Sequence, residues 1–475
     1  MGRPARVPRP AADLWTRRLT EFFRPFEDLL EVGVRSSDTR RNARAYLTGL
    51  LLPGERKSME PLARRLPGAT ADRLQQFITD SPWNADLVQR RLIESLAPRL
   101  ASARGVLALD DTSFPKQGTA SVGVARQWCG SLGKPANCQV GVSLYYVRPD
   151  PRYNPDLTGF SLGTRLYLPH AWAEDPRRRA RARVPPYVEF VEKWRIGLAL
   201  VDRALELKVL HRAVLADADY GTRHEFREGL RTRGERYAVG IQLRATKVMP
   251  LGARDRPVQE RPSFPGELAD ALPPSAWRTV RWGRGTKGPL TMELARIRVE
   301  VWYGNRHRKG SPSEPTGERV WLVFERRSNE TKAYLIWGFD GVSLRGLAEL
   351  FRARWPIEQG FQQMKEELGL DHFEGRTWTG WHHHVTMVAL AHAFLMRQRV
   401  EGVPSGERLP TLPKVRRWLS GMVGLALARA SQKAKDTALR DRLLDRVFAM
   451  NDIPVYLRRG TWWMPTLRQY AKEDA

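Results

Sequence analysis

The segment that decides the fold is Val106–Lys116, which reads VLALDDTSFPK. It begins as a continuous apolar run and passes directly into two acidic residues, Asp110 and Asp111. Such a short run, bounded by polar residues, is typical of a strand that is buried on both faces of a sheet. A carboxylate at the end of a buried strand is costly to desolvate unless a positive group neutralises it. The segment therefore predicts a central strand that carries an acid into a charged site.

A second segment further along the chain repeats this combination. AVLADADYG, at residues 213–221, reads as a strand in which Asp217 directly follows an apolar run and Asp219 comes two residues later. A single acid in this position more often caps a helix or closes a turn, but two such strand ends favour a shared site. A divalent metal is the usual partner of acids brought together in this way. Asp217 is preferred over Asp219 because it follows the strand directly.

A third acid lies in the helical part of the chain. FRARWPIEQGFQQMKEELGL, at residues 351–370, contains Glu358, Gln362 and Lys365 at spacings of four and three. This spacing places the three side chains on one face of a helix. Pro356 suits the first turn of that helix. Taken alone, the pattern is that of an ordinary exposed charged face.

Four positions of this segment match a known signature, Tyr-x2-Arg-x3-Glu-x6-Lys. They are filled, with Phe in place of Tyr, by Phe351, Arg354, Glu358 and Lys365. On these residues the chain resembles the DDE transposases of bacterial insertion sequences. Residues 109–142 and 367–384 also resemble that family, and the resemblance spans roughly residues 41–397. The Phe removes a hydroxyl that family members would offer to a DNA phosphate.

The resemblance implies an RNase H-like mixed sheet with flanking helices, whose acids hold two Mg²⁺ ions, with Mn²⁺ as a possible substitute. The implied metal ligands are Asp110, Asp217 and Glu358. Successive strand side chains point to opposite faces, so only one of Asp110 and Asp111 is expected to reach the site. Asp110 is preferred, and Asp111 stays open as a catalytic alternative. The implied DNA contacts are Phe351, Arg354 and Lys365.

Hydrophobic periodicity divides the chain into five parts. Residues 175–186, DPRRRARARVPP, read as a basic loop, and residues 245–317 show only one clear strand, at 295–301. With the identities that the resemblance implies, the predicted parts are a helical N-terminal DNA-binding region (1–104), the first part of an RNase H-like catalytic core (105–244), a β-rich insertion domain (245–340), the second part of the core (341–400) and a C-terminal helical region (401–475).

The composition favours a nucleic-acid partner. The 475 residues contain 79 Lys and Arg against 52 Asp and Glu, a formal net charge of +27. Dense positive surfaces bind polyanions because they release counterions from phosphates. Two cysteines exclude a disulfide framework, and no run is long enough to span a bilayer. We expect a cytoplasmic, nucleoid-associated protein that binds double-stranded DNA and no membrane and, by the resemblance, acts as a homodimer on paired ends.

The resemblance implies a transposase that cuts insertion-sequence ends and joins them to target DNA by two-metal phosphoryl transfer. One alternative is a metal-dependent nuclease of the same fold that cuts without joining. The other is a catalytically inactive DNA-binding protein derived from a transposase. Acids at all three expected positions argue against this last alternative.

Overall fold

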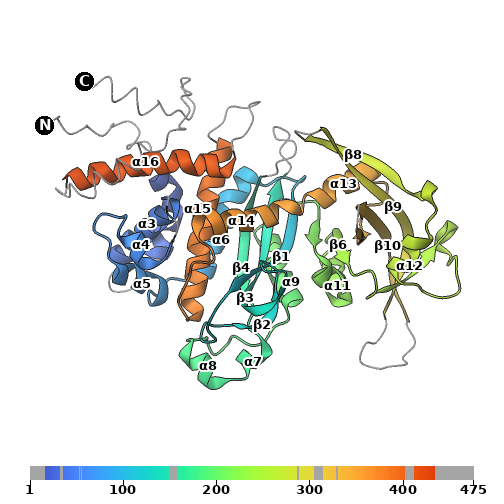
Figure 1. Ribbon diagram of the computed structural model, residues 1–475, viewed down its shortest axis with the longest axis horizontal. Helices are drawn as coiled ribbons and strands as arrows, with labels where there is room; N and C mark the ends of the chain where they lie inside the picture. The colour runs from blue at the N-terminus through green and yellow to red at the C-terminus, as the bar shows by residue number, and fades with distance from the viewer. Residues whose placement is uncertain are drawn as a thin grey trace.

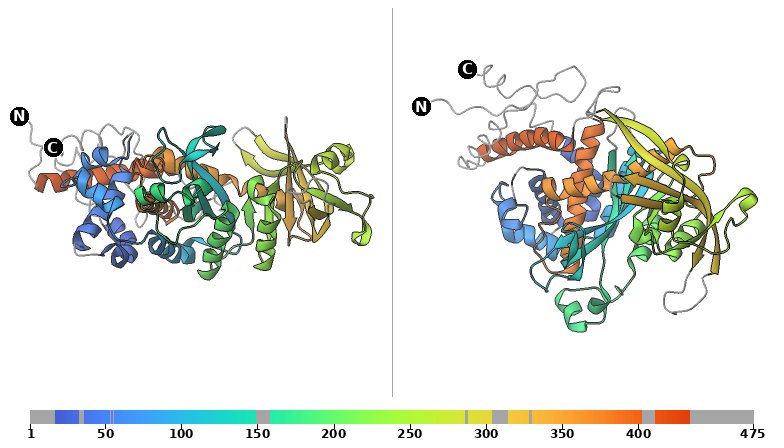
Figure 2. Two further views of the ribbon diagram at one scale, coloured as in Figure 1. Left: turned by 90° about the horizontal axis from the view of Figure 1, so that it is seen from below. Right: turned by 45° about the vertical axis from the view of Figure 1, so that its right-hand side comes forward.

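The computed structural model describes residues 17–433, except residues 33–35, 53, 55, 149–157, 286–287, 304–313, 328–329 and 402–410. Helices lie at one end, a large sheet lies in the middle, and a second group of strands lies at the other end (Figure 1). The N-terminal helices (blue) and strands β8 to β10 (yellow to gold) stay at opposite ends in both views of Figure 2. The prediction of an α/β protein is confirmed. Among the described residues, no helix is long and apolar enough to cross a membrane.

The central part of the sheet has the strand order β4-β3-β1-β5-β6. The first three strands of this order are antiparallel neighbours, whereas β1, β5 and β6 run parallel to one another. This mixed order is consistent with the RNase H-like fold that the resemblance implied. Strand bounds are β1 (Val106–Pro115), β2 (Ala125–Cys129), β3 (Lys134–Arg148), β4 (Thr158–Leu166), β5 (Val214–Ala216) and β6 (Tyr237–Ile241).

Strand β1 is the centre of this sheet. All four of its first residues, Val106–Leu109, are buried, because β1 lies between β3 and β5 and helices cover both faces. Gly197 on α9 (Lys193–Glu206) brings that helix close, since a Cβ there would lie 2.5 Å from a methyl group of Leu109. The prediction of a buried central strand at this segment is confirmed.

Residues 247–337 extend the same sheet. β11 pairs with β6, and the order continues through β10, β9 and β7, with β8 paired to β9. The expectation of one clear strand within 245–317 was wrong, because Pro250 in β7 and a register shift at Gly283 in β8 obscure the strand pattern. The bounds are β7 (Lys247–Leu251), α12 (Pro265–Ala271), β8 (Arg278–Gly285), β9 (Gly288–Tyr303), β10 (Glu314–Arg327) and β11 (Glu330–Trp337).

Two local predictions need correction. Residues 175–186, expected as a loop, contain helix α8 (Pro176–Arg181), since Asp175 Oδ1 accepts hydrogen bonds from two backbone amides and Pro occupies the first position. The strand expected to reach residue 221 ends at Ala216, because Asp217 caps the short helix α10 (Ala218–Gly221). In both cases an acidic cap decides where the helix begins.

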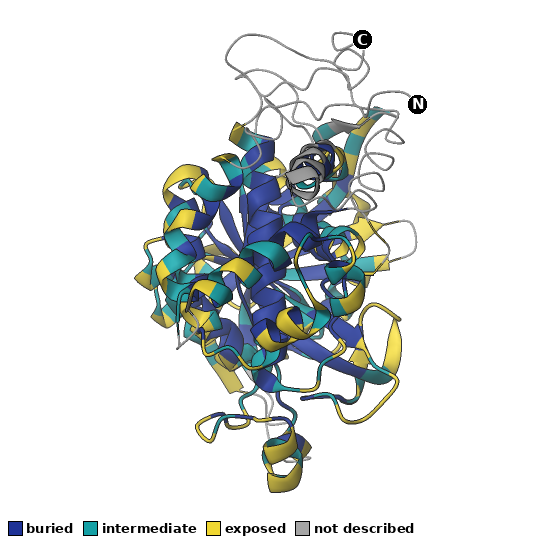
Figure 3. Cartoon of the chain, turned by 90° about the vertical axis from the view of Figure 1, so that its left-hand side faces the viewer, coloured by how far each residue is buried: buried dark blue, intermediate teal, exposed yellow. Residues whose placement is uncertain are grey.

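The helical end of the molecule is built around α15 (Trp378–Glu401). Nearly every residue of α15 is buried, and it belongs to the dark blue interior of Figure 3. α15 packs against β4 and against the helices α3, α5, α6 and α16. Other helices are α2 (Glu27–Leu30), α3 (Ser36–Leu51), α4 (Met59–Ala63), α5 (Ala71–Thr79), α6 (Ala85–Leu100), α7 (His170–Ala173), α11 (His224–Thr232), α13 (Leu344–Arg352), α14 (Trp355–Leu368) and α16 (Leu412–Lys433).

A buried ion-pair network joins the added strands to the core. Glu318 on β10, only 3% exposed, accepts hydrogen bonds from Arg227 Nε at 2.8 Å and Nη2 at 3.0 Å, and from the Tyr237 hydroxyl. Arg231 Nη1 lies 2.8 Å from the same carboxylate. Arg227 also donates to the carbonyl oxygen of Gly221, the last residue of α10, at 2.7 Å. The network therefore ties β10 to α11 and to the short helix that follows the second predicted acid.

Candidate active site

Two predicted acids occupy adjacent positions on neighbouring parallel strands. In the pairing of β1 with β5, Leu109 lies opposite Ala216, so the next residues are Asp110 and Asp217. Asp217 Oδ1 accepts hydrogen bonds from two backbone amides of α10, at 3.0 and 3.4 Å, which fixes its carboxylate at the end of β5. The structure thus brings these two residues side by side, as predicted from their positions after apolar runs, although β1 continues beyond Asp110 to Pro115.

Glu358 approaches the same region from the first turn of α14. Arg354, the residue before α14, donates from Nη1 to Asp110 Oδ2 at 2.8 Å and from Nη2 to Glu358 Oε1. Gly360 allows α14 to lie close to the sheet, since a Cβ there would lie 2.9 Å from the ring of Tyr145. The guanidinium group therefore bridges the first and the third predicted acid.

Asp111 lies in a different environment. Its Oδ2 is 2.7 Å from Lys193 Nζ at the start of α9, and its Oδ1 accepts a hydrogen bond from the Tyr220 hydroxyl. Asp110 and Asp111 thus contact different elements, α14 and α9, as expected for successive residues of a strand. Asp110 is the aspartate of the pair that contacts the helix of Glu358.

Burial and neighbouring charges shift the pKa of Asp110 and of Asp217 in the same direction. Burial is the largest cause and raises the pKa of Asp110 to about 8 and the pKa of Asp217 to about 6. The charges of Asp217 and Asp111 add to the first shift, and those of Asp219 and Asp111 add to the second. Arg354 opposes both shifts. Both carboxyl groups are therefore pushed towards their protonated form when no further positive charge is present.

The three predicted DNA-contacting residues all have protein partners. Besides the contacts of Arg354, Lys365 Nζ donates to the carbonyl oxygen of Ser113 on β1 at 2.8 Å, and burial lowers its pKa. The ring of Phe351 stacks on Tyr334 of β11, with 4.1 Å between ring centroids. Arg354 and Lys365 thus lie along β1 on the side of α14, and Phe351 packs between α13 and the sheet.

The residues present fit a divalent metal by the chemistry of their donors. Asp110, Asp217 and Glu358 offer only carboxylate oxygens, which suit Mg²⁺, and the raised pKa of the two aspartates reflects a demand for positive charge. Within the described part of the chain, no three His, Cys, Asp or Glu side chains are grouped closely enough to hold a metal ion. Arg354 is the cation between Asp110 and Glu358 in this arrangement. Metal binding by all three acids therefore requires Arg354 to release its partners.

Protonation of Asp110 and Asp217 is expected to contribute stability to the metal-free protein as the pH falls from 8 to 6. Asp110 and Asp217 have a higher pKa in the folded state than the ~3.9 of an unfolded chain. The native state therefore binds protons more tightly, and the stability gained at low pH is lost as the pH rises through 6 and 8. Calorimetry of the wild type and of Asp110→Asn in EDTA between pH 5 and 9 measures this contribution as the difference between their Tm profiles.

Two further measurements tie that pH dependence to the site. Asp110→Asn should reduce the change of Tm with pH at the alkaline end of the range, because it removes the carboxyl group with the higher pKa. Mg²⁺ should raise Tm more at pH 8 than at pH 6, because metal ions and protons compete for the carboxylates. A Tm profile unchanged by Asp110→Asn would contradict this description of the site.

Sequence reasoning missed two residues that shape the site. Tyr220 belongs to the same segment as Asp217 but bonds to Asp111 on the neighbouring strand. Lys193 comes from α9 and carries no local signal of its role. Only the pairing of distant strands and helices places them here.

Two aspartates side by side on neighbouring strands, with a glutamate from a later helix, are the arrangement that characterises DDE enzymes. The chain belongs to the DDE superfamily endonuclease family, whose model matches residues 26–289. The model of the Transposase DDE domain matches residues 195–394. The chain is also 23% identical over 372 residues to a probable transposase for insertion sequence element IS701 from Microchaete diplosiphon, covering 77% of this chain and 83% of that protein. The predicted family, the DDE transposases of insertion sequences, is confirmed.

Proposed function

We propose that the protein is a DNA transposase that cuts insertion-sequence ends and joins them to target DNA by two-metal phosphoryl transfer. The observation that carries the proposal is that Asp110 and Asp217 lie side by side on neighbouring strands and that Arg354 bridges Asp110 to Glu358. Family membership supports cleavage of nucleic acid. The relative described as a probable transposase for IS701 supports insertion-sequence ends as the substrate.

Each charged side chain of the site has a proposed role in catalysis. Asp110, Asp217 and Glu358 would hold Mg²⁺, or Mn²⁺ in its place. Bound metal ions supply activation of the attacking oxygen and stabilisation of the leaving oxygen. Arg354, once released from Asp110 and Glu358, binds the negatively charged phosphate of the DNA. Lys365, about two turns after Glu358 on α14, contacts the same DNA strand. No side chain needs to form a covalent bond to DNA.

Three further proposals concern the rest of the chain. We propose that the helices of residues 1–104 contact duplex DNA, which the net charge of +27 supports. Residues 245–340 are proposed to be an insertion into the core, because β7 to β11 extend the sheet beyond β6 and the chain then returns to the core as α14. A homodimer on paired DNA ends is proposed by analogy with the family.

Strand transfer separates a transposase from a nuclease. The full chain is incubated with Mg²⁺, a target plasmid and a pre-cleaved DNA end, and a joined product is expected. The pre-cleaved end carries a free 3′-hydroxyl and is taken from DNA flanking the gene. The Glu358→Gln variant serves as the control without activity. Cleavage without joining would favour the nuclease, and neither reaction in Mg²⁺ or Mn²⁺ would favour an inactive DNA-binding protein.

A further inference from the structure

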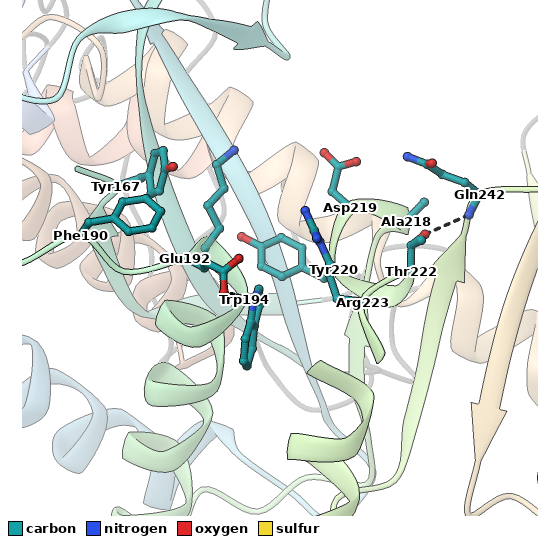
Figure 4. Close-up of a pocket in the computed structure, with 11 residues that line it drawn as sticks. Tyr167, Phe190, Glu192, Trp194, Ala218, Asp219, Tyr220, Thr222, Arg223 and Gln242 are labelled. Carbon is teal, nitrogen blue, oxygen red and sulfur yellow. Dashed lines mark hydrogen bonds between the residues drawn. The ribbon is translucent and has the colours of Figure 1, made fainter. Parts of the chain in front are cut away.

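A pocket of about 400 Å³ opens beside the carboxylates, on the α9 side of the sheet. Figure 4 shows Tyr167 and Phe190 on one side of it and Asp219 and Gln242 on the other. Lys193 also lines the pocket. Pockets of ~300–1,000 Å³ are typical of sites for small ligands. Neither the three acids nor the side chains of α14 that are proposed to bind DNA line this pocket.

One wall of the pocket is aromatic. The rings of Tyr167 and Phe190 meet edge to face at 6.2 Å between centroids, and His170 supports Phe190 at 5.0 Å. Phe190 is 36% exposed even so. An aromatic face held by neighbouring rings and left open to solvent is a surface on which a nucleobase can stack.

The opposite wall carries polar groups that are free to bind. Asp219 and Arg223 are exposed, and Gln242 lies beside them. Within the part of the chain that the structure describes, the side chains of these three residues form no hydrogen bond or ion pair. Amide and carboxylate groups can bond the edge of a base, and a guanidinium group suits a phosphate. The polar wall thus complements the aromatic wall.

The pocket adjoins the proposed chemistry directly. Ala218 and Asp219 on its rim follow Asp217 in the chain. Lys193 and Tyr220, which also line it, bond the carboxylate of Asp111 on β1. A ligand in the pocket would therefore lie next to the strand whose phosphate meets the acids.

We propose that this pocket binds one unpaired nucleotide of the DNA strand beside the scissile phosphate, with the base against Phe190 and Tyr167 and a phosphate at Arg223. In a duplex both faces of each base are covered by its neighbours, so only an unpaired base can stack on the aromatic wall. The proposal rests on the proposed function for its choice of DNA as the ligand. It adds a binding site for single-stranded DNA that the three acids and α14 do not provide.

The test compares single-strand binding by matched variants of the full chain. A fluorescein-labelled thymidine oligonucleotide in EDTA reports the Kd by anisotropy. Phe190→Ala is expected to raise the Kd about tenfold, because one stacked base is lost. Arg223→Ala is expected to raise it by a similar factor and to reduce its salt dependence. Tyr187→Ala is the control, because Tyr187 is an aromatic residue nearby that is 83% exposed and does not line the pocket.

A second readout reports stacking itself. An oligonucleotide that contains 2-aminopurine should lose fluorescence on binding to the wild type and recover it in Phe190→Ala. Equal Kd values for the wild type and Phe190→Ala, or an equal loss in Tyr187→Ala, would overturn the proposal. Cleavage of duplex ends by the wild type is measured in parallel. Failure of the wild type to cleave would contradict the proposed transposase function. If the wild type cleaves and Phe190→Ala leaves the Kd unchanged, only the proposed nucleotide-binding pocket is contradicted.

Discussion

Replacing Glu358 with Gln is expected to slow DNA cleavage by about 10³-fold or more. The change removes one of three proposed metal ligands, and metal stabilisation of the developing charge is worth several kcal/mol, with each ~1.4 kcal/mol equal to a factor of ten. The Glu358 side chain is 49% exposed and pairs with Arg354, so its replacement opens no cavity. Gel analysis of labelled DNA ends over time in Mg²⁺ measures the rate.

The same helix offers a matched control. Glu366, also exposed on α14, accepts a hydrogen bond from Gln362 at 2.8 Å. Glu366→Gln removes the same charge from the same helix and is expected to cleave at the wild-type rate. Wild-type cleavage by Glu358→Gln, or an equal loss in Glu366→Gln, would contradict the assignment of Glu358.

The two neighbouring aspartates of β1 can be separated by the same assay. Asp110→Asn is expected to lose as much activity as Glu358→Gln. Asp111→Asn should lose less, because the carboxylate of Asp111 is held by Lys193 and Tyr220 rather than by the helix of Glu358. The opposite order would make Asp111 the first metal ligand.

Replacing Glu318 with Ala is expected to lower the free energy of unfolding by about 3–5 kcal/mol, the cost of removing one partner from a buried ion pair. Burial alone would raise the pKa of Glu318, but Arg227, His224 and Arg231 hold it far below its usual value. The change would leave Arg227, which is 1% exposed, without a charged partner. Urea denaturation followed by circular dichroism measures the effect.

Glu314, an exposed residue at the start of the same strand, provides the comparison for Glu318. Glu314→Ala should leave the urea midpoint within experimental error. Because the depressed pKa of Glu318 favours its charged form, the stabilisation is present at neutral pH and is lost only in strong acid. A loss below about 1 kcal/mol for Glu318→Ala would show that the network is not a buried ion pair in solution.

The two aspartate-bearing strands were predictable because their chemistry is local. VLAL and AVLA each combine an apolar run with an acid, and burial on both faces of a central strand requires such runs. The bounds of helix α6, Ala85–Leu100, are also set locally, by the cap at Asn84 and by a regular apolar spacing. Recognition of the third acid needed the resemblance, since Glu358 alone looks like a surface charge.

The remaining features depend on contacts between distant segments. The strands of residues 247–285 carry Pro and Gly and follow no clean alternation, so their pairing with β9 decides their structure. The bridge from Arg354 to Asp110 joins residues 244 positions apart. Glu318 reads as a polar residue of an irregular stretch, and only the packing of α11 on β10 shows that it is buried.

The measurement that tests the central claim most directly is metal rescue of cysteine variants at the three acids. Asp110→Cys, Asp217→Cys and Glu358→Cys replace a hard oxygen ligand with a softer thiolate, which Mg²⁺ binds poorly and Mn²⁺ accepts better. The three variants are predicted to lose DNA cleavage in Mg²⁺ and to recover part of it in Mn²⁺. Cleavage at the wild-type rate in Mg²⁺ by any of the three would contradict the claim that these carboxylates hold the catalytic metals.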